Sequence, residues 1–267
     1  MAPAAPAIIT LTTDFGLRDS YVAEMKAAIL GVTRHVQLID VTHEVPAHDV
    51  MEGALTLEAA APRFPPGAVH LAVVDPGVGT ARRGLALAWR NWMFVGPDNG
   101  LFTPFLGEDW KAVELTASEY RRPAVSPTFH GRDVFAPAAA HLACGVDLGR
   151  LGPTVGDPIR IDWPDARETL DGIEGTVVLV DRFGNLVTSV REEAVAGAPT
   201  GTLIRIAGRE LLLVRTYADL PRGAPGALIG SRGRLEIAVR EGRAEVLLGA
   251  AKGAPVLLRT SRSTRIR

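Results

Sequence analysis

The residue types best suited to chemistry lie in the segment LAVVDPGVGTARR, residues 71–83. Its first four residues are apolar and predict a short buried strand, which ends at Asp75 because a proline and a glycine follow. Arg82 and Arg83 come later in the same loop. Open α/β sheets bind their ligands at the carboxyl ends of parallel strands, so the segment predicts a site that uses a carboxylate and an arginine. A plain strand-ending turn, with Asp75 capping turn amides and both arginines solvated, is the alternative.

Other polar residues stand where further strands or loops of the N-terminal half are expected to end. Asp14 follows the first strand, Asp98 and Asn99 follow the fifth, and His130 precedes the last helix. Each has a local explanation as a turn or loop residue. Because a parallel sheet brings its strand ends to one edge, their recurrence favours a site shared with Asp75. Asp14, Asp75 and His130 could also hold a hard metal ion, so metal-assisted hydrolysis is a minority interpretation.

The C-terminal half contains two loops of similar character, DRFGN at 181–185 and GSRG at 230–233. In the first loop, Phe183 could offer a flat surface to a heterocycle, and Asn185 could donate to and accept from its edge. An ordinary hairpin turn explains the same residues, and the loop alone does not decide between the two.

A proline-containing segment, 153–171, is expected to be a linker, and it divides the predicted helices and strands into two domains. Before it, the pattern predicts an α/β domain, residues 1–152, with a mostly parallel sheet and flanking helices. After it, short β-like runs predict a smaller antiparallel domain, either β-barrel-like or a sandwich, residues 172–267. The expected strands are 7–13, 36–41, 71–74, 84–89, 92–95, 113–115, 175–180, 186–190, 202–206, 211–214, 227–229, 234–239 and 256–258, and the expected helices are 21–32, 49–61 and 134–143, the first of them capped by Asp19 or Ser20.

The composition narrows the class of protein. The 267 residues carry a formal charge of −1 without a basic excess, so we expect a small polar ligand and no nucleic acid. No run approaches the ~20 apolar residues of a transmembrane helix, and the N-terminus lacks the basic region of a signal peptide. We therefore expect a cytoplasmic protein without membrane contact. The single cysteine, Cys144, lies in an apolar run that predicts a buried thiol, and residues 262–267 predict a frayed basic tail.

Taken together, the motifs resemble one family. They are TTDFG at 12–16, RDSYV at 18–22, VDPGVG at 74–79, GPDNG at 96–100, TFHGRDVFAP at 128–137, DRFGNLVT at 181–188 and SRG at 231–233. This ordered set, which runs from about Ile8 to Leu258, resembles the S-adenosyl-L-methionine (SAM) hydroxide adenosyltransferases, also called SAM hydrolases. Those enzymes are relatives of the SAM-dependent fluorinating and chlorinating enzymes.

The resemblance implies hydrolysis of SAM to adenosine and L-methionine, without a metal or a separate cofactor. It also implies a homotrimer that binds SAM between neighbouring subunits. An aromatic residue of the halogenating relatives is replaced by His48 here. The implied catalytic set is Asp75, Arg82 and His130, with Arg82 preferred to Arg83 by spacing alone; Asp14 is implied for the ribose, Asp19 and Ser20 for the methionine end, Phe183 and Asn185 for adenine, and Ser231 and Arg232 for the methionine carboxylate.

The chemistry of SAM agrees with this assignment. Methionine leaves C5′ as a neutral thioether and needs no general acid, so the site must position and activate one water. Arg82 would keep Asp75 charged and fixed, and His130 would accept or relay the proton. The alternatives are a SAM-dependent halogenase, whose members carry a tyrosine in place of Asp75, and a non-catalytic adenosine- or SAM-binding module.

Overall fold

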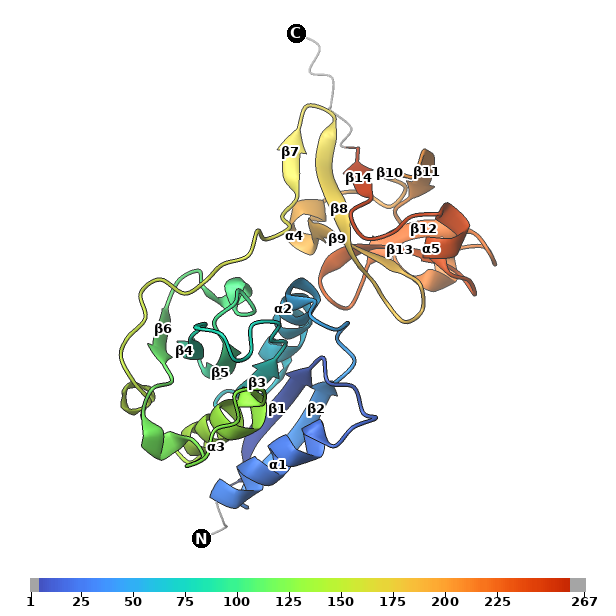
Figure 1. Cartoon of the computed structure of the whole chain (residues 1–267). Coiled ribbons are helices and arrows are strands. Elements are labelled where there is room, and N and C mark those ends of the chain that lie inside the picture. Colours follow the sequence, from blue (N-terminus) through green and yellow to red (C-terminus); the bar gives the residue numbers. More distant parts are fainter. Residues whose placement is uncertain (1–4, 260–267) are drawn as a thin grey trace. The chain divides into compact units, whose positions relative to one another are not determined.

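The computed structural model describes residues 5–259, which form two compact units, one ending at Trp163 and the other beginning at Pro164 (Figure 1). The predicted basic tail, 262–267, lies outside the described residues. The boundary between the units falls within the segment expected to be a linker, 153–171. Its first part packs on the N-terminal unit, where Thr154 bridges a strand, and its second part contains a short strand of the C-terminal unit.

Six strands of the N-terminal unit form a mixed sheet in the order β2-β1-β3-β5-β4-β6. The neighbours from β2 to β5 are parallel, whereas β4 pairs antiparallel with β5 and β6. The predicted α/β class is confirmed. The strands are β1 (Ala7–Thr13), β2 (Val36–Thr42), β3 (Val69–Val73), β4 (Gly84–Trp89), β5 (Trp92–Pro97) and β6 (Trp110–Glu114), and the helices are α1 (Tyr21–Val32), α2 (Val50–Ala60) and α3 (Ala136–Ala143).

Different helices cover the two faces of this sheet. Alternation along the buried strand β3 sends Leu71 and Val73 into one apolar cluster with Met25 of α1 and with residues of α3. Ala72 instead joins a cluster with Leu57 of α2. Figure 1 shows α1 and α3 side by side on their face of the sheet. Because β1 and β3 are parallel neighbours, the loops that begin at Asp14 and after Val73 leave the same edge of the sheet.

The C-terminal unit is an antiparallel, barrel-like sheet in the order β11-β10-β14-β8-β9-β13-β12, with β7 added beside β8. A bridge between Leu213 and Ala227 links the two ends of this order, so the barrel is nearly closed, as predicted. Its elements are β7 (Arg167–Thr169), β8 (Gly172–Val180), β9 (Leu186–Arg191), α4 (Glu192–Val195), β10 (Leu203–Ile206), β11 (Arg209–Leu212), β12 (Pro225–Ile229), β13 (Arg234–Val239), α5 (Ala244–Leu248) and β14 (Pro255–Leu258).

Two local expectations were wrong. Ser20 stands at the N-cap of α1, but its hydroxyl makes no capping hydrogen bond and donates to Glu24 Oε1 instead, at 2.7 Å. Cys144 is exposed and stands at the C-cap of α3, directly after the last helical residue. By contrast, Asp49 caps α2 by accepting a hydrogen bond from the Glu52 amide. Among residues 5–259, none of the helices has the length and apolar character needed to cross a lipid bilayer.

The buried histidine of β3 predicts a loss of stability in acid. His70 is 1% exposed and hydrogen-bonds Thr10, and burial lowers its pKa from 6.5 to about 4. The folded state therefore binds fewer protons than the unfolded chain, so this stability is complete above pH 6.5 and is lost as the pH falls toward 4. We expect the free energy of unfolding to fall by about 3 kcal/mol over that range from this residue.

Chemical denaturation of the wild type and of His70→Asn at pH 7 and at pH 4.5 measures this contribution. The variant should lose less stability on acidification than the wild type does. His35→Asn removes an exposed histidine and serves as the control. Equal losses in the wild type and in His70→Asn would contradict the assignment.

Candidate active site

Asp75, Arg82 and His130 are in direct contact. The Arg82 guanidinium donates from Nε to both Asp75 carboxylate oxygens, at 2.9 and 3.0 Å, and a further nitrogen of the guanidinium also contacts Oδ2. The same terminal nitrogen lies 2.9 Å from His130 Nδ1. The side chains of Asp75 and Arg82 are only 4% and 9% exposed, so the charges of the pair compensate each other away from bulk water. Phe135 supports the group, with Arg82 Cζ 5.0 Å from its ring centre.

The loop after β3 returns Arg82 to Asp75 because it contains two successive turns. The Val78 amide donates to the Asp75 carbonyl, and the Thr80 hydroxyl donates to the Gly77 carbonyl at 2.7 Å. The Arg82 amide then donates to the Thr80 hydroxyl. A carboxylate and an arginine separated by six residues therefore face each other within one loop.

Gly79 brings this loop against the loop that carries His130. Its φ is +78°, and a Cβ at this position would lie 2.7 Å from the carbonyl oxygen of Pro127. The left-handed backbone and the close approach both require glycine here. The two loops thus touch backbone to backbone beside the catalytic candidates.

Arg83 does not take part in this group. Its Nε donates to Asp98 Oδ2 at 2.8 Å, and its NH1 donates to Asp157 Oδ1 at 2.9 Å. Asp98 also accepts from the Ile159 amide, at 2.8 Å. Arg83 and Asp98 therefore fasten the segment around Asp157 to the N-terminal unit, and Arg82 is the arginine that contacts Asp75.

A cavity of about 590 Å³ in the N-terminal unit is lined by Asp14, His48, Asp75 and His130. Asp14 follows β1, and its Oδ2 accepts a hydrogen bond from the His48 amide at 2.9 Å. His48 has a φ of +67°, an uncommon conformation for a residue other than glycine, and it directs its backbone N–H at Asp14. The structure thus gathers Asp14, Asp75 and His130 around one cavity, as expected, whereas Asp98 and Asn99 do not line it: Asp98 pairs with Arg83, and Asn99 donates to the Val74 carbonyl.

Asp133 anchors the loop that carries His130. It lies in a turn of π-helix, Gly131–Phe135, which begins directly after His130. The Asp133 side chain is fully buried and accepts from Arg132 Nε at 2.7 Å and from the Ser126 amide at 2.9 Å. Burial raises the pKa of Asp133, but the hydrogen bonds from Arg132 and Ser126 outweigh this effect and hold the pKa below its usual value. The Asp133 carbonyl also accepts from the Arg122 amide, so both ends of the segment 122–130 are tied to one residue.

The surroundings of His130 favour its neutral form. Burial and then the charge of Arg82 lower the pKa of His130 below its ordinary value. Arginine has only donors, so the contact at Nδ1 makes that nitrogen the acceptor. The proton of the neutral imidazole is therefore on Nε2, and His130 presents an N–H donor at its other edge.

Asp19 and Ser20 are exposed and do not line this cavity. Ser20 donates to Glu24, which does line it, and Glu24 Oε2 accepts from Arg132 at 2.8 Å. The hydrogen bonds from Ser20 and from Arg132 lower the pKa of Glu24. The first turn of α1 is thus connected to the cavity through Glu24, and Ser20 reaches it only indirectly.

In the C-terminal unit, Asp181 organises the loop that carries Phe183 and Asn185. Its Oδ1 accepts from the amides of Phe183 and Asn185, at 2.8 and 2.9 Å, and its Oδ2 accepts from Asn185 Nδ2 at 3.0 Å. Phe183 is 72% exposed, whereas Asn185 is buried. Ser231 and Arg232 are exposed on a separate turn of the same unit, which the Gly230 amide closes by donating to the Arg234 carbonyl.

Sequence reasoning missed a buried polar pair in this unit. Tyr217 donates from its hydroxyl to Glu236 Oε1 at 2.6 Å, although Glu236 is 5% exposed in the apolar strand β13. Burial raises the pKa of Glu236 and that of Tyr217, and the charge of Asp181 adds to both effects. The available signal was a carboxylate within the apolar run 234–239, two residues after an arginine. Its partner Tyr217 is 19 residues away in the chain and carries no such signal.

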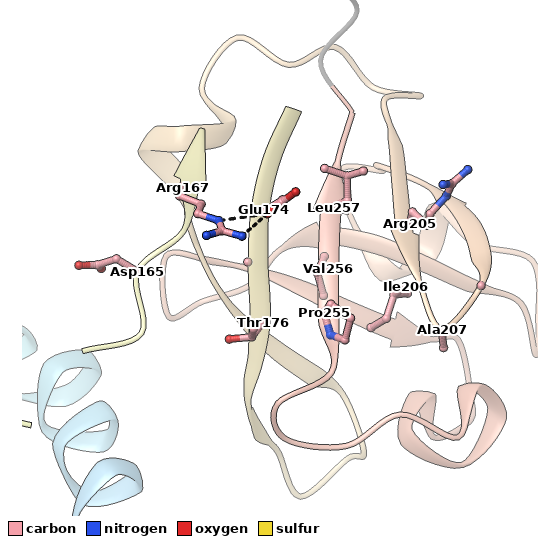
Figure 2. Close-up of a pocket in the computed structure, with 12 residues that line it drawn as sticks. Asp165, Arg167, Glu174, Thr176, Arg205, Ile206, Ala207, Pro255, Val256 and Leu257 are labelled. Carbon is pink, nitrogen blue, oxygen red and sulfur yellow. Dashed lines mark hydrogen bonds and ion pairs between the residues drawn. The ribbon is translucent and has the colours of Figure 1, made fainter. Parts of the chain in front are cut away.

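A second cavity, also of about 590 Å³, lies in the C-terminal unit beside β7, β8, β14 and β10 (Figure 2). Figure 2 shows an ion pair between Arg167 and Glu174 at its edge, with a nitrogen–oxygen distance of 2.8 Å. The Arg167 side chain is largely exposed and that of Glu174 is partly buried, and none of the predicted site residues lines this cavity. The catalytic candidates belong to the cavity of the N-terminal unit. Within residues 5–259, no three His, Cys, Asp or Glu side chains are grouped so as to hold a metal ion.

Both units match domain models of one known protein family. The model of the SAM hydroxide adenosyltransferase N-terminal domain matches residues 9–152, and that of the C-terminal domain matches residues 175–257. A crystal structure described as an uncharacterized conserved protein from Thermotoga maritima is 32% identical, with a TM-score of 0.87, and the match covers 94% of this chain and 99% of that one.

Named relatives agree with these matches. The (R)-S-adenosyl-L-methionine hydrolase of Thermus thermophilus is 44% identical over 255 residues, covering 92% of this chain and 97% of the relative. That of Salinispora tropica is 43% identical, with 92% and 95% covered. The fluorinase of Actinopolyspora mzabensis is more distant, at 29% identity with 86% and 90% covered. Because both units match in order and the hydrolases align over almost their whole length, this chain belongs to the SAM hydroxide adenosyltransferase family.

Proposed function

We propose that this protein is an enzyme that hydrolyses SAM to adenosine and L-methionine. The observation that carries the proposal is the contact of Asp75, Arg82 and His130 beside a cavity that Asp14 also lines. The names of the hydrolase relatives specify the (R) configuration at sulfur, and the proposal includes that configuration. The net reaction converts the SAM cation and water into adenosine, methionine and one proton.

In this mechanism the water attacks C5′ in line with the departing sulfur. The bond between C5′ and sulfur breaks as the new C–O bond forms, and methionine leaves as a neutral thioether. Asp75 Oδ2 accepts from two nitrogens of Arg82, whereas Oδ1 accepts only from Nε and keeps a lone pair that can accept a hydrogen bond from the water. Asp75 thus orients the nucleophile and accepts the proton that the water loses as the C–O bond forms, and this proton then passes to solvent.

In this proposal His130 acts as a hydrogen-bond donor, in place of the acceptance or relay of the proton that the sequence suggests. Since Arg82 occupies Nδ1, the neutral ring offers Nε2–H, which donates to the oxygen of the water and aligns its lone pair with C5′. Two groups of opposite hydrogen-bonding character, an acceptor and a donor, would then define one water position. Arg82 positions both groups through its contacts to Asp75 and to His130 Nδ1.

The wider arrangement in this proposal follows the resemblance. Asp14 holds the ribose hydroxyls, Phe183 and Asn185 hold adenine, and Asp19, Ser20, Ser231 and Arg232 serve the methionine end. The protein acts in the cytoplasm as a homotrimer, with SAM between neighbouring subunits and without a metal or separate cofactor. Sedimentation equilibrium tests the assembly against the mass of the single 28.4 kDa chain.

The reaction is tested by incubating the purified protein with each sulfur epimer of SAM in ¹⁸O-water and separating the products. We expect adenosine and methionine from the (R) epimer, with the heavy oxygen at C5′ of adenosine, and no effect of a chelator. A 5′-halogenated adenosine in the presence of halide would instead support the halogenase alternative. Intact SAM with measurable binding would support the non-catalytic module.

A further inference from the structure

Three aromatic rings lie together on the wall of the cavity that contains Asp75. Phe15, Tyr21 and Phe129 all line it. Their ring centres are 5.9 Å apart for Phe15 and Tyr21, 6.0 Å for Phe15 and Phe129, and 5.3 Å for Tyr21 and Phe129. Every pair meets edge to face, at interplanar angles of 61° to 86°. We call these residues the aromatic cluster.

Each ring of the aromatic cluster is adjacent in sequence to a residue assigned to a different part of the substrate. Phe15 follows Asp14, Tyr21 follows Ser20, and Phe129 precedes His130. In the proposed function, these neighbours serve the ribose, the methionine end and the reacting carbon, in that order. The atom of SAM that lies between ribose, methionine and reacting carbon is the sulfonium sulfur.

An aromatic wall has the right chemistry for that atom. A sulfonium cannot donate a hydrogen bond, but its charge is attracted to the electron-rich face of an aromatic ring. Arg132 already uses one ring in this way, with Cζ 4.9 Å from the centre of Phe129. Glu24 and Arg132, which also line the cavity, form an ion pair at 2.8 Å, so together they add no net charge and leave the aromatic rings as the attractive feature of this wall.

We infer that the aromatic cluster is the sulfonium subsite, and that Tyr21 is the ring by which the enzyme distinguishes SAM from neutral thioethers. The inference rests on the proposed function, which supplies the placement of SAM. Tyr21 is the ring to test because it is 48% exposed, so its replacement leaves the apolar core intact. Phe129 is already engaged by Arg132 and is less suitable.

The predicted kinetic effect is on substrate binding, because sulfur loses its charge in the transition state as the C5′–S bond breaks. A ring that stabilises the cation therefore stabilises the ground state at least as much as the transition state. Its removal should raise KM without lowering kcat. Neutral methionine is then no longer held by the rings, which favours its release.

The test compares Tyr21→Leu, which removes the ring, with Tyr21→Phe, which keeps it. The ligands are SAM, sinefungin, whose ammonium group stands in the place of the sulfonium, and the neutral thioether S-adenosylhomocysteine. For Tyr21→Leu we expect weaker sinefungin binding and a higher KM for SAM, each by about fivefold to thirtyfold, as for a cation–π contact of ordinary strength. S-adenosylhomocysteine affinity should change far less, and Tyr21→Phe should retain the wild-type ratio of the two affinities.

Two outcomes would overturn the inference. Equal weakening of the charged and the neutral ligand in Tyr21→Leu would show that the ring makes only apolar contact. Loss of the ratio in Tyr21→Phe would assign the effect to the hydroxyl. Calorimetry with sinefungin and S-adenosylhomocysteine requires no turnover, so it decides the subsite even if the wild type leaves SAM intact and the proposed function fails.

Discussion

Asp75→Asn lowers kcat for SAM hydrolysis by about 10²–10⁴-fold, the usual loss when one positioned acid–base group is removed. Asparagine keeps the shape of the side chain but removes its charge and places an N–H where the attacking water needs an acceptor. Arg82 loses its ionic partner at the same time. SAM should still bind, because Asp14 and the aromatic cluster are unchanged. Steady-state kinetics and calorimetry with SAM measure the two effects separately.

The matched control is Asp98→Asn. The Asp98 side chain is 2% exposed, close to the 4% of Asp75, and is paired with the neighbouring arginine, Arg83, but it lies outside the reacting group. This control should retain turnover in the folded protein, and its melting temperature reports any loss of stability. Turnover near the wild-type level in Asp75→Asn would remove Asp75 from the mechanism.

Arg82→Lys should lower kcat by about 10²-fold or more, since a lysine is a poor substitute at a site of several simultaneous hydrogen bonds. The planar guanidinium contacts both Asp75 oxygens and His130 Nδ1, whereas an ammonium is a single point donor on a flexible stem. Once Nδ1 is released, the imidazole can adopt either tautomer, and Nε2–H is no longer enforced. Arg83→Lys provides the control, because Arg83 serves the contacts to Asp98 and Asp157.

A spectroscopic signal distinguishes this positioning role from a general effect on stability. Long-range ¹H–¹⁵N spectra of the wild type should show His130 as the Nε2–H tautomer, and those of Arg82→Lys should show a mixture. A variant with slow turnover but an unchanged tautomer would mean that Arg82 acts on Asp75 alone. Slow turnover in Arg83→Lys of equal size would contradict the assignment of Arg82.

The alternation of elements in the N-terminal unit was predictable because local pattern and burial agree. The strand 7–13 and the helix 21–32 have the expected bounds, since apolar periodicity and turn residues delimit both. The strand β3 begins two residues earlier than expected, at Val69, because a buried histidine interrupts its apolar run. The choice between Arg82 and Arg83 depended on the two turns of the loop, which spacing alone does not define.

Contacts between segments far apart in the chain could not be predicted from the sequence. Asp133 gave no sign that it would tie the segment 122–130 to the π-helical turn, because its partners are backbone amides and arginines common in any surface loop. The pairing of Tyr217 with Glu236 likewise depends on how the barrel closes. The exposure of Cys144 depends on where α3 ends, and helix ends are set by tertiary packing as much as by local residues.

The close approach of Gly79 to Pro127 also bears on how this pocket could be re-engineered. Any mutation of Gly79 adds a Cβ that would collide with a backbone oxygen, so libraries that randomise this codon would consist mostly of misassembled pockets. Val78 and Thr128, which line the cavity on either side of that contact, can vary without parting the two loops. Diversity placed at these two positions would reshape the space around the substrate while Asp75 and His130 keep their spacing.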